Sequence, residues 1–291
     1  MELNYSVVHT PARPAASVVM LRDGSAGLEV FLVRRHGASA VLGGAHVFPG
    51  GKLDEADAAP ALLARLDQPL DHLHTALGEN DTDPATAAAL HVAALREVFE
   101  ESGVLFALPG TVAEVSNAAA LLKDGIGFDA ALLQLGLRLN TRAVLPWTRW
   151  ITPTSPTVMN KRFDTRFFVA AVPDGQEARH DNYEAIESVW LPPRAAMEHY
   201  WDGRIDLAPP QIMSLAHLAR HASVDTVFAE ARGRRPPVIQ PEPFDDEGTR
   251  TICYPGDVRH SVAESAMPGP SRLRYRNKRF EPLDGFEAFF N

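Results

Sequence analysis

The chain opens with two hydrophobic stretches whose patterns are typical of β-strands. Residues 15–21 form a continuous apolar run that is closed by the turn residues Asp23 and Gly24. Residues 29–35 alternate between apolar and polar positions. Short runs of this kind, separated by turn residues, predict two strands, and the short connection between them predicts an antiparallel pair.

Further along, the spacing of apolar positions changes to that of a helix. Apolar residues between positions 90 and 99 repeat at three- and four-residue intervals, which places them on one helical face. Asp83 followed by Pro84 is a start signal, because Asp caps free backbone N–H groups and proline suits the first helical position. Gly103 is suited to end the helix. These signals predict a helix over residues 84–102.

The rest of the chain mixes shorter segments of both kinds. Helices are predicted at 58–66, 70–77, 195–200 and 210–221, and within 112–137 with breaks near Gly125 and Gly136. Strands rich in aromatic and β-branched residues are predicted at 147–152, 163–172 and 187–191, with further candidates at 250–254 and 272–280. The proline-rich, charged stretch 233–248 predicts a linker.

Three glutamates near the end of the predicted helix 84–102 suggest chemistry. Glu97, Glu100 and Glu101 stand at i, i+3 and i+4, so their carboxylates share one helical face. Like charges at this spacing destabilise a helix by roughly 0.2–0.5 kcal/mol per pair. Negative charge at a helix C-terminus also opposes the helix dipole. A hard divalent cation such as Mg²⁺, which takes oxygen ligands, would relieve this cost.

A glycine-rich stretch precedes the helix by about forty residues. Residues 43–51 contain a short apolar core flanked by glycines and end in Pro49-Gly50-Gly51. Glycines permit positive φ angles and let the backbone approach a ligand closely. A plain turn is the alternative interpretation of this stretch.

Composition limits the partners that the chain can take. At 291 residues, with 45% apolar and 22% charged residues, it resembles an ordinary globular protein. Its net charge of −9 argues against a nucleic-acid or acidic-membrane binder, but allows a small polyanionic substrate held by local cations. Cys253 is the single cysteine, so no internal disulfide forms. Without a long apolar run or a signal-peptide pattern, we expect a cytoplasmic protein.

At residues 96–104 the sequence Arg-Glu-Val-Phe-Glu-Glu-Ser-Gly-Val resembles the second half of the Nudix hydrolase signature at every fixed position. Pro49-Gly50-Gly51 resembles the loop that opens this signature. Two departures accompany the match. Asp57 stands at the position of the first signature Glu, and the 38 residues from 58 to 95 replace the usual seven, so about 31 are inserted. Such an insertion is tolerable because loop-closure cost grows only logarithmically with length.

The position of the insertion is similar to that in one branch, the peroxisomal coenzyme A diphosphatases of the nudix-motif-19 type. Further resembling stretches span residues 45–51, 150–153, 162–168 and 190–193. A coenzyme A-associated pattern is only partial, because Arg35 and Gly44 are present but Ala40 replaces a second Arg. The resemblance implies cleavage of a diphosphate bond in coenzyme A or acyl-CoA. ADP-ribose, NADH or another nucleoside diphosphate derivative remains an alternative substrate, and a non-catalytic nucleotide-binding module remains an alternative class.

The fold that the resemblance implies is α/β: a Nudix-type α/β/α sandwich with a mixed sheet. The Nudix domain is expected over residues 1–222, with a helical insertion at about 58–83. Residues 223–291 are expected to form a linker and a C-terminal extension. The expected partner is a small-molecule diphosphate, with a homodimer as an open alternative to a monomer.

The resemblance also assigns roles to individual residues. It implies that Glu97 and Glu101 coordinate Mg²⁺ or Mn²⁺, with Glu100 at or near the cluster and the carbonyl of Gly50 completing the protein ligands. Arg96 would orient a glutamate. The general base is expected to be Glu184, with Glu177, Glu187 and Glu97 itself as rivals.

Basic and aromatic residues are candidates for contacts with the substrate. Arg35, Lys161, Arg162 and Arg166 could bind phosphate, because guanidinium groups match phosphate geometry. On an alternating strand Arg162, Asp164 and Arg166 share a face, so a structural charge ladder is the alternative. His46 could contact phosphate or be a structural histidine. Trp147 and Trp150 could stack on adenine, although core positions are favoured.

Overall fold

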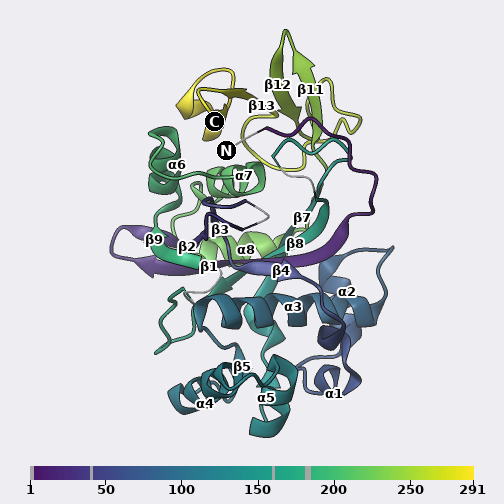
Figure 1. Ribbon diagram of the computed structural model, residues 1–291, viewed down its shortest axis with the longest axis vertical. Helices are drawn as coiled ribbons and strands as arrows, with labels where there is room; N and C mark the ends of the chain where they lie inside the picture. The colour runs from purple at the N-terminus through teal and green to yellow at the C-terminus, as the bar shows by residue number, and fades with distance from the viewer. Residues whose placement is uncertain (1–2, 40–41, 159–160, 181–184) are drawn as a thin grey trace.

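The computed structural model describes residues 3–39, 42–158, 161–180 and 185–291. A mixed eight-stranded sheet crosses the middle of the molecule (Figure 1). Its path runs β10-β7-β8-β1-β2-β3, with β4 paired to β1 and β9 paired to β2. Its strands are β1 (Arg13–Gly24), β2 (Gly27–Arg35), β3 (His46–Val47), β4 (Gly50–Lys52), β7 (Val144–Ile151), β8 (Phe163–Ala171), β9 (Ala185–Leu191) and β10 (Val238–Ile239).

Helices cover both faces of this sheet (Figure 1). One layer contains α1 (Pro60–Leu63), α2 (Leu70–Leu77), α3 (Pro84–Ser102), α4 (Val112–Lys123) and α5 (Phe128–Leu135). The opposite layer contains α6 (Pro193–Trp201), α7 (Pro209–Leu218) and α8 (Val224–Gly233). The short strands β5 (Ala107–Leu108) and β6 (Arg138–Leu139) pair beside α4 and α5. The expected α/β/α sandwich with a mixed sheet is confirmed.

The apolar run 15–21 is continuous because β1 is buried on both faces. Val18 and Met20 belong to the core beneath α3, whereas Val19 and Leu21 belong to the core beneath α6 and α7. A strand with a helical layer on each side has no solvent face to mark with polar residues. The predicted antiparallel pairing of β1 with β2 is confirmed.

The predicted helix 84–102 is confirmed as α3, including its ends. The Asp83 side chain accepts a hydrogen bond from the backbone of Thr86 at 2.9 Å, and Gly103 adopts a left-handed φ of 72°. Alanines fill much of the helix surface, and Ala87, Ala93 and Ala94 are fully buried. Their small side chains allow α3, the helix that carries the glutamates, to pack closely on β1.

The C-terminal part of the chain has more regular structure than its composition predicts. The expected linker 233–248 is wrong: it contains β10, which pairs with β7, and β11 (Glu242–Asp246). Pro243 is tolerated because β11 is an edge strand. The prediction from sequence also missed α8, although its apolar residues stand at helical spacing, at Val224, Val227, Phe228 and Ala231.

A separate four-stranded sheet lies beside α6 and α7 (Figure 1). It consists of β11, β12 (Thr249–Cys253), β13 (Arg272–Arg276) and β14 (Arg279–Glu281). The single strand predicted at 272–280 is a hairpin, because Asn277 and Lys278 take positive φ angles and form its turn. The Tyr200 hydroxyl of α6 donates to the Phe280 carbonyl and accepts from its N–H. The expected domain boundary at residue 222 stays a prediction.

No helix among the described residues combines the length and apolar character that a membrane crossing requires.

Candidate active site

The last two turns of α3 carry an arginine that three carboxylates share. Arg96 donates through Nη1 to Glu97 Oε1 at 2.7 Å and to Glu100 Oε2 at 3.0 Å. Its Nε and Nη2 contact the two Asp57 oxygens at 2.8 and 3.0 Å. Burial opposes the arginine charge, but the Asp57 hydrogen bond and the neighbouring carboxylates raise the Arg96 pKa above its ordinary value. Arg96 therefore stays charged and orients Glu97 and Glu100.

Asp57 anchors this arrangement from outside the helix. Only 1% of its surface is exposed, and it forms a two-pronged ion pair with Arg96. One of its oxygens also accepts the backbone N–H of Asp54 at 2.8 Å. Paired hydrogen bonds between a guanidinium and a carboxylate restrict orientation as well as distance. Asp57 thus fixes the side-chain rotamer of Arg96, although it lies 39 residues earlier in the sequence.

Two glycines bring the backbone of β4 against the glutamates. The N–H of Gly50 donates to Glu101 Oε2 at 3.0 Å. A Cβ atom at Gly51 would collide with the Glu97 carboxylate, and one at Gly50 would lie 2.5 Å from the Ala16 carbonyl oxygen. At Gly50 the obstructing atoms belong to the backbone and cannot move aside, whereas at Gly51 a side chain would displace the Glu97 carboxylate.

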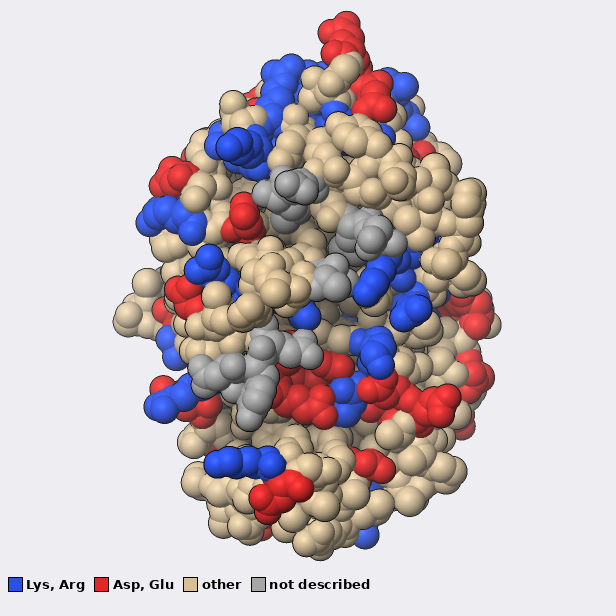
Figure 2. Space-filling model, in the orientation of Figure 1, with Lys and Arg blue, Asp and Glu red and all other residues tan. Residues whose placement is uncertain are grey.

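The cluster has more negative than positive charge. Five carboxylates (Asp54, Asp57, Glu97, Glu100 and Glu101) lie beside three cations, Arg35, Lys52 and Arg96. Burial raises the pKa of Glu100, which Arg96 partly offsets. Figure 2 shows acidic side chains gathered in a band across this face, at the level of β4 and α3 in Figure 1. The oxygen-rich donor set and the excess negative charge fit a hard divalent cation.

A cavity of about 440 Å³ adjoins the cluster. Glu97, Gly50 and Gly51 line one part of it. Basic side chains also reach its lining, namely Arg13, Arg35, Lys52 and Lys161. Most of the remaining wall is apolar, including Phe48, Trp150, Phe163, Phe167, Pro209 and Ile252. This volume falls in the range of small-molecule sites.

Comparison with known proteins identifies the family. A family profile described as the NUDT19 Nudix domain matches residues 7–218, more than half of the chain. The chain belongs to the NUDT19 Nudix family. It is a Nudix hydrolase, in agreement with the signature at residues 96–104.

Individual relatives agree with this assignment. The chain is 26% identical to putative nudix hydrolase 7 of Caenorhabditis elegans over 262 residues, which are 89% of this chain and 78% of the relative. It is 28% identical to acyl-coenzyme A diphosphatase NUDT19 of Homo sapiens over 248 residues, or 72% of this chain. That match spans 65% of the human protein, just under two thirds of its length.

A solved structure confirms the Nudix fold. The crystal structure of a NUDIX hydrolase from Alicyclobacillus acidocaldarius is similar to this chain with a TM-score of 0.60 and 28% sequence identity. The similarity covers 76% of this chain and 97% of that one.

The predicted metal residues of this Nudix domain lie together. Glu97, Glu100, Glu101 and Gly50 meet where α3 faces β4, and Arg96 contacts two of the glutamates as expected. Their ligand roles remain predictions.

Glu184, the expected general base, lies outside the described residues, as does Ala40. Two of the three rival bases are exposed: Glu177 pairs with Arg179 at 2.6 Å, and Glu187 lies 3.5 Å from Arg34.

The predicted phosphate contacts are distributed over three environments. Arg35 and Lys161 line the cavity. Arg162 instead donates to the carbonyls of Thr152 and Thr10, and is tied to the backbone. His46 is buried, and this burial lowers its pKa, so its ring is neutral near pH 7. Arg13 and Lys52 also line the cavity, but the sequence did not single them out. The only feature of the sequence that marks them is their position at the ends of strands.

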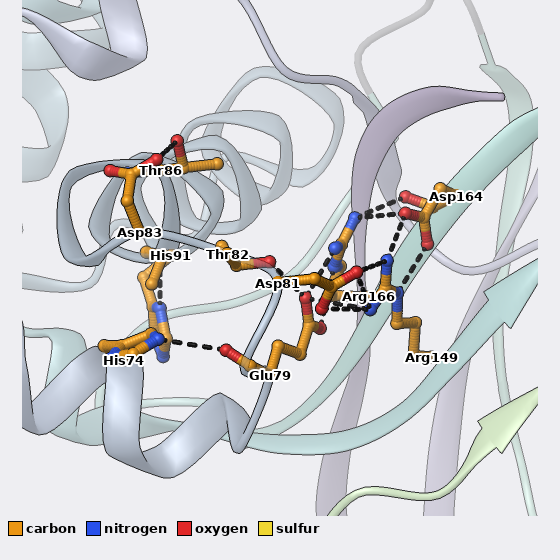
Figure 3. A network of polar contacts seen from close by, with 11 residues as sticks. His74, Glu79, Asp81, Thr82, Asp83, Thr86, His91, Arg149, Asp164 and Arg166 are labelled. Atoms are coloured by element: carbon orange, nitrogen blue, oxygen red, sulfur yellow. Dashed lines mark hydrogen bonds and ion pairs between the residues drawn. The ribbon is translucent and has the colours of Figure 1, made fainter. Parts of the chain in front are cut away.

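Arg166 belongs to a structural ion-pair network (Figure 3). Its Nε and Nη2 contact the two Glu79 oxygens at 2.9 and 2.5 Å, and Arg149 forms the same kind of pair with Asp164 at 2.9 and 2.8 Å. Asp81 lies 3.3 Å from Arg149. Glu79 and Asp81 belong to the insertion, so this network attaches the insertion to β7 and β8.

Trp147 and Trp150 are both buried, although Trp150 also lines the cavity.

A second group with metal-ligand chemistry lies at α7 and α8. Ligand atoms of His217, His221 and Glu230 lie within 4.8 Å of one another. Arg234 already donates to Glu230 at 2.7 Å, and burial lowers the pKa of His217 to about 4. Because the guanidinium neutralises the single carboxylate, we assign this group to the packing of α7 on α8.

Proposed function

We propose that this chain is a metal-dependent Nudix diphosphatase that acts on coenzyme A or acyl-CoA. The products would be 3′,5′-ADP and 4′-phosphopantetheine or its acyl derivative. The observation that carries this proposal is the cavity, which joins the Glu97 cluster to basic residues and to a long apolar wall. The name of the human relative, acyl-coenzyme A diphosphatase NUDT19, supports the same substrate class.

Glu97, Glu101 and the Gly50 carbonyl would hold Mg²⁺ or Mn²⁺, with Glu100 nearby. When bound, the cation would neutralise the diphosphate and lower the pKa of the attacking water. Arg96 keeps Glu97 and Glu100 in place, and Asp57 keeps Arg96 in place. The glycines of β4 let its backbone lie against Ala16 and Glu97, where a larger residue would collide. Preorganised charges of this kind avoid reorganisation during the reaction.

The proton from the attacking water needs an acceptor. Glu97 is the cluster carboxylate that lines the cavity, and it is half-buried. Glu184 remains our first assignment, with Glu97 as the alternative. Comparing the pH profiles of Glu184→Gln and Glu97→Gln distinguishes them, because loss of the base removes the acidic limb of the rate profile.

A substrate panel tests the function. Purified protein with Mg²⁺ or Mn²⁺ is incubated with coenzyme A, acetyl-CoA, palmitoyl-CoA, ADP-ribose and NADH, and products are identified by mass spectrometry. We expect 3′,5′-ADP from the coenzyme A compounds. Turnover of ADP-ribose or NADH without turnover of coenzyme A would assign the alternative substrate. Binding of nucleotides without any turnover would assign the non-catalytic module. A cytoplasmic location and a homodimer remain predictions.

A further inference from the structure

The cavity wall includes residues that are remote in sequence from the Nudix signature. Pro241, Pro243 and Ile252 line it, and all three follow the last residue matched by the family profile. Pro243 on β11 pairs directly with Ile252 on β12. Directly paired residues in an antiparallel sheet project to the same side. The C-terminal sheet therefore presents one face to the cavity beside the glutamates.

Charge is unevenly distributed around this cavity. Arg13 on β1 is the sheet partner of Phe163, and Lys161 lies two residues before it. Lys52 on β4 pairs with Ala15, two residues after Arg13. These three cations therefore lie at the same end of the paired strands β1, β4 and β8. The lining residues from the C-terminal sheet, Pro243 and Ile252, carry no charge, and neither does Pro241 just before β11.

The C-terminal sheet is held firmly in this position. Arg250 on β12 donates to the Ser155 hydroxyl at 2.9 Å, which ties β12 to the loop that follows β7. That loop supplies further lining residues, including Pro153 and Pro156. Trp150 packs against Tyr254 with ring centroids 5.9 Å apart. The wall is thus built before any ligand arrives, which lowers the entropic cost of binding an apolar chain.

We propose that the C-terminal sheet is the specificity wall of the active site, with Ile252 and Pro243 contacting the acyl-pantetheine arm. This inference rests on the proposed function. The two halves of an acyl-CoA differ in the same way as the two parts of the cavity. The 3′,5′-ADP half carries the phosphates and matches the strand ends with Arg13, Lys52 and Lys161. The acyl arm is uncharged and matches the apolar wall.

Substitutions at position 252 test the wall. We measure kcat/KM for coenzyme A, acetyl-CoA, hexanoyl-CoA and palmitoyl-CoA with wild type, Ile252→Ala and Ile252→Phe. Ile252→Phe should lower kcat/KM for the longest chains about tenfold or more relative to coenzyme A, because pocket size discriminates by about this factor per methylene. Ile252→Ala should shift the preference toward longer chains.

Leu273→Ala is the matched control. Leu273 is the β13 partner of Ile252 and is fully buried, but it lies outside the described cavity lining. The Leu273→Ala variant should lower the melting temperature without changing the order of the substrates by kcat/KM. If Ile252→Ala unfolds the chain, the same kinetics are measured with the smaller change Ile252→Val and with Pro243→Ala, at a position that is half-buried.

The outcomes separate the inference from the function on which it rests. If wild type cleaves the coenzyme A series but the Ile252 variants change all substrates equally, the wall does not select the acyl arm. An equal shift in Leu273→Ala would indicate general loosening and would also overturn the inference. Altered discrimination among nucleotide halves, measured with dephospho-CoA, would place adenine against the wall instead. Failure of the proposed function is seen earlier, as wild type that cleaves no coenzyme A compound.

Discussion

The arginine–carboxylate cluster at β7 and β8 and the one at α3 differ in how their largely buried arginines and acids are matched. At β7 and β8, Arg149 takes both oxygens of Asp164 and Arg166 takes both oxygens of Glu79 (Figure 3), so the two largely buried acids are matched one to one, while the third acid, Asp81, is exposed. At α3, the single guanidinium of Arg96 serves Asp57, Glu97 and Glu100.

The difference between the clusters indicates their roles. A buried ion pair with one guanidinium for each carboxylate needs no other cation, and breaking it exposes a charge in the interior. Where buried carboxylates outnumber the cations beside them, the uncompensated negative charge costs free energy, which an added cation would lower. Charge mismatch, rather than the number of charged residues, therefore marks the candidate catalytic site.

Glu101→Gln should have the largest effect, and it should act on turnover. The amide keeps an oxygen that can accept the Gly50 N–H but loses the negative charge that a cation needs. We expect kcat to fall on the order of 10³-fold with an almost unchanged melting temperature. Steady-state kinetics at saturating Mg²⁺, with thermal unfolding as the fold control, measures this. An unchanged kcat would refute the site.

Glu79→Gln should have the opposite effect: it should lower stability and leave turnover nearly unchanged. It leaves Arg166 buried with a weaker partner, which should lower the free energy of unfolding by about 3 kcal/mol. Turnover per folded molecule should stay within about twofold, because Arg166 lies outside the described lining of the cavity. Urea unfolding followed by tryptophan fluorescence gives the first quantity and initial rates give the second. A large loss of kcat in folded protein would contradict the comparison.

Asp57→Asn connects stability and activity at the α3 cluster. The amide can no longer accept two guanidinium hydrogen bonds, so Arg96 loses its fixed orientation while the glutamates remain. We expect kcat to fall about 10–100-fold, as for other groups that orient metal ligands. The apparent affinity for Mn²⁺, measured by activity titration, should weaken in parallel. A loss confined to thermal stability would reduce Asp57 to a packing residue.

Acid should weaken the fold through buried histidines. Burial lowers the pKa of His91, on α3 beside Phe168, to about 4. An unfolded histidine has a pKa of about 6.5, so between these values the unfolded chain binds more protons. Stability should therefore fall as pH drops from about 6.5 toward 4, by at most about 1.4 kcal/mol per pH unit for this residue. Urea unfolding between pH 7 and pH 5 measures the slope, which His91→Gln should reduce.

Local signals in the sequence were enough to predict α3 and the arrangement of its glutamates. Asp83, Pro84 and Gly103 determine where the helix begins and ends, and helical spacing places Glu97, Glu100 and Glu101 on one face. The need for glycine at positions 50 and 51 was also predictable, although its cause, the closeness of Ser17 and Glu97, was not. The helix ends and the spacing of the glutamates depend on neighbours within a few residues, whereas the close approach at Gly50 and Gly51 depends on tertiary contacts.

The tertiary structure alone decided which distant residues meet. Asp57 pairs with Arg96 and Glu79 pairs with Arg166 across long stretches of chain. The same residue types therefore support the proposed metal site in one place and attach the insertion to the sheet in the other. Ile252 reaches the cavity only because the C-terminal sheet packs beside α7. Hydrophobic period and capping act over one or two turns, whereas ion-pair partners and cavity walls depend on how the loops close and the layers pack.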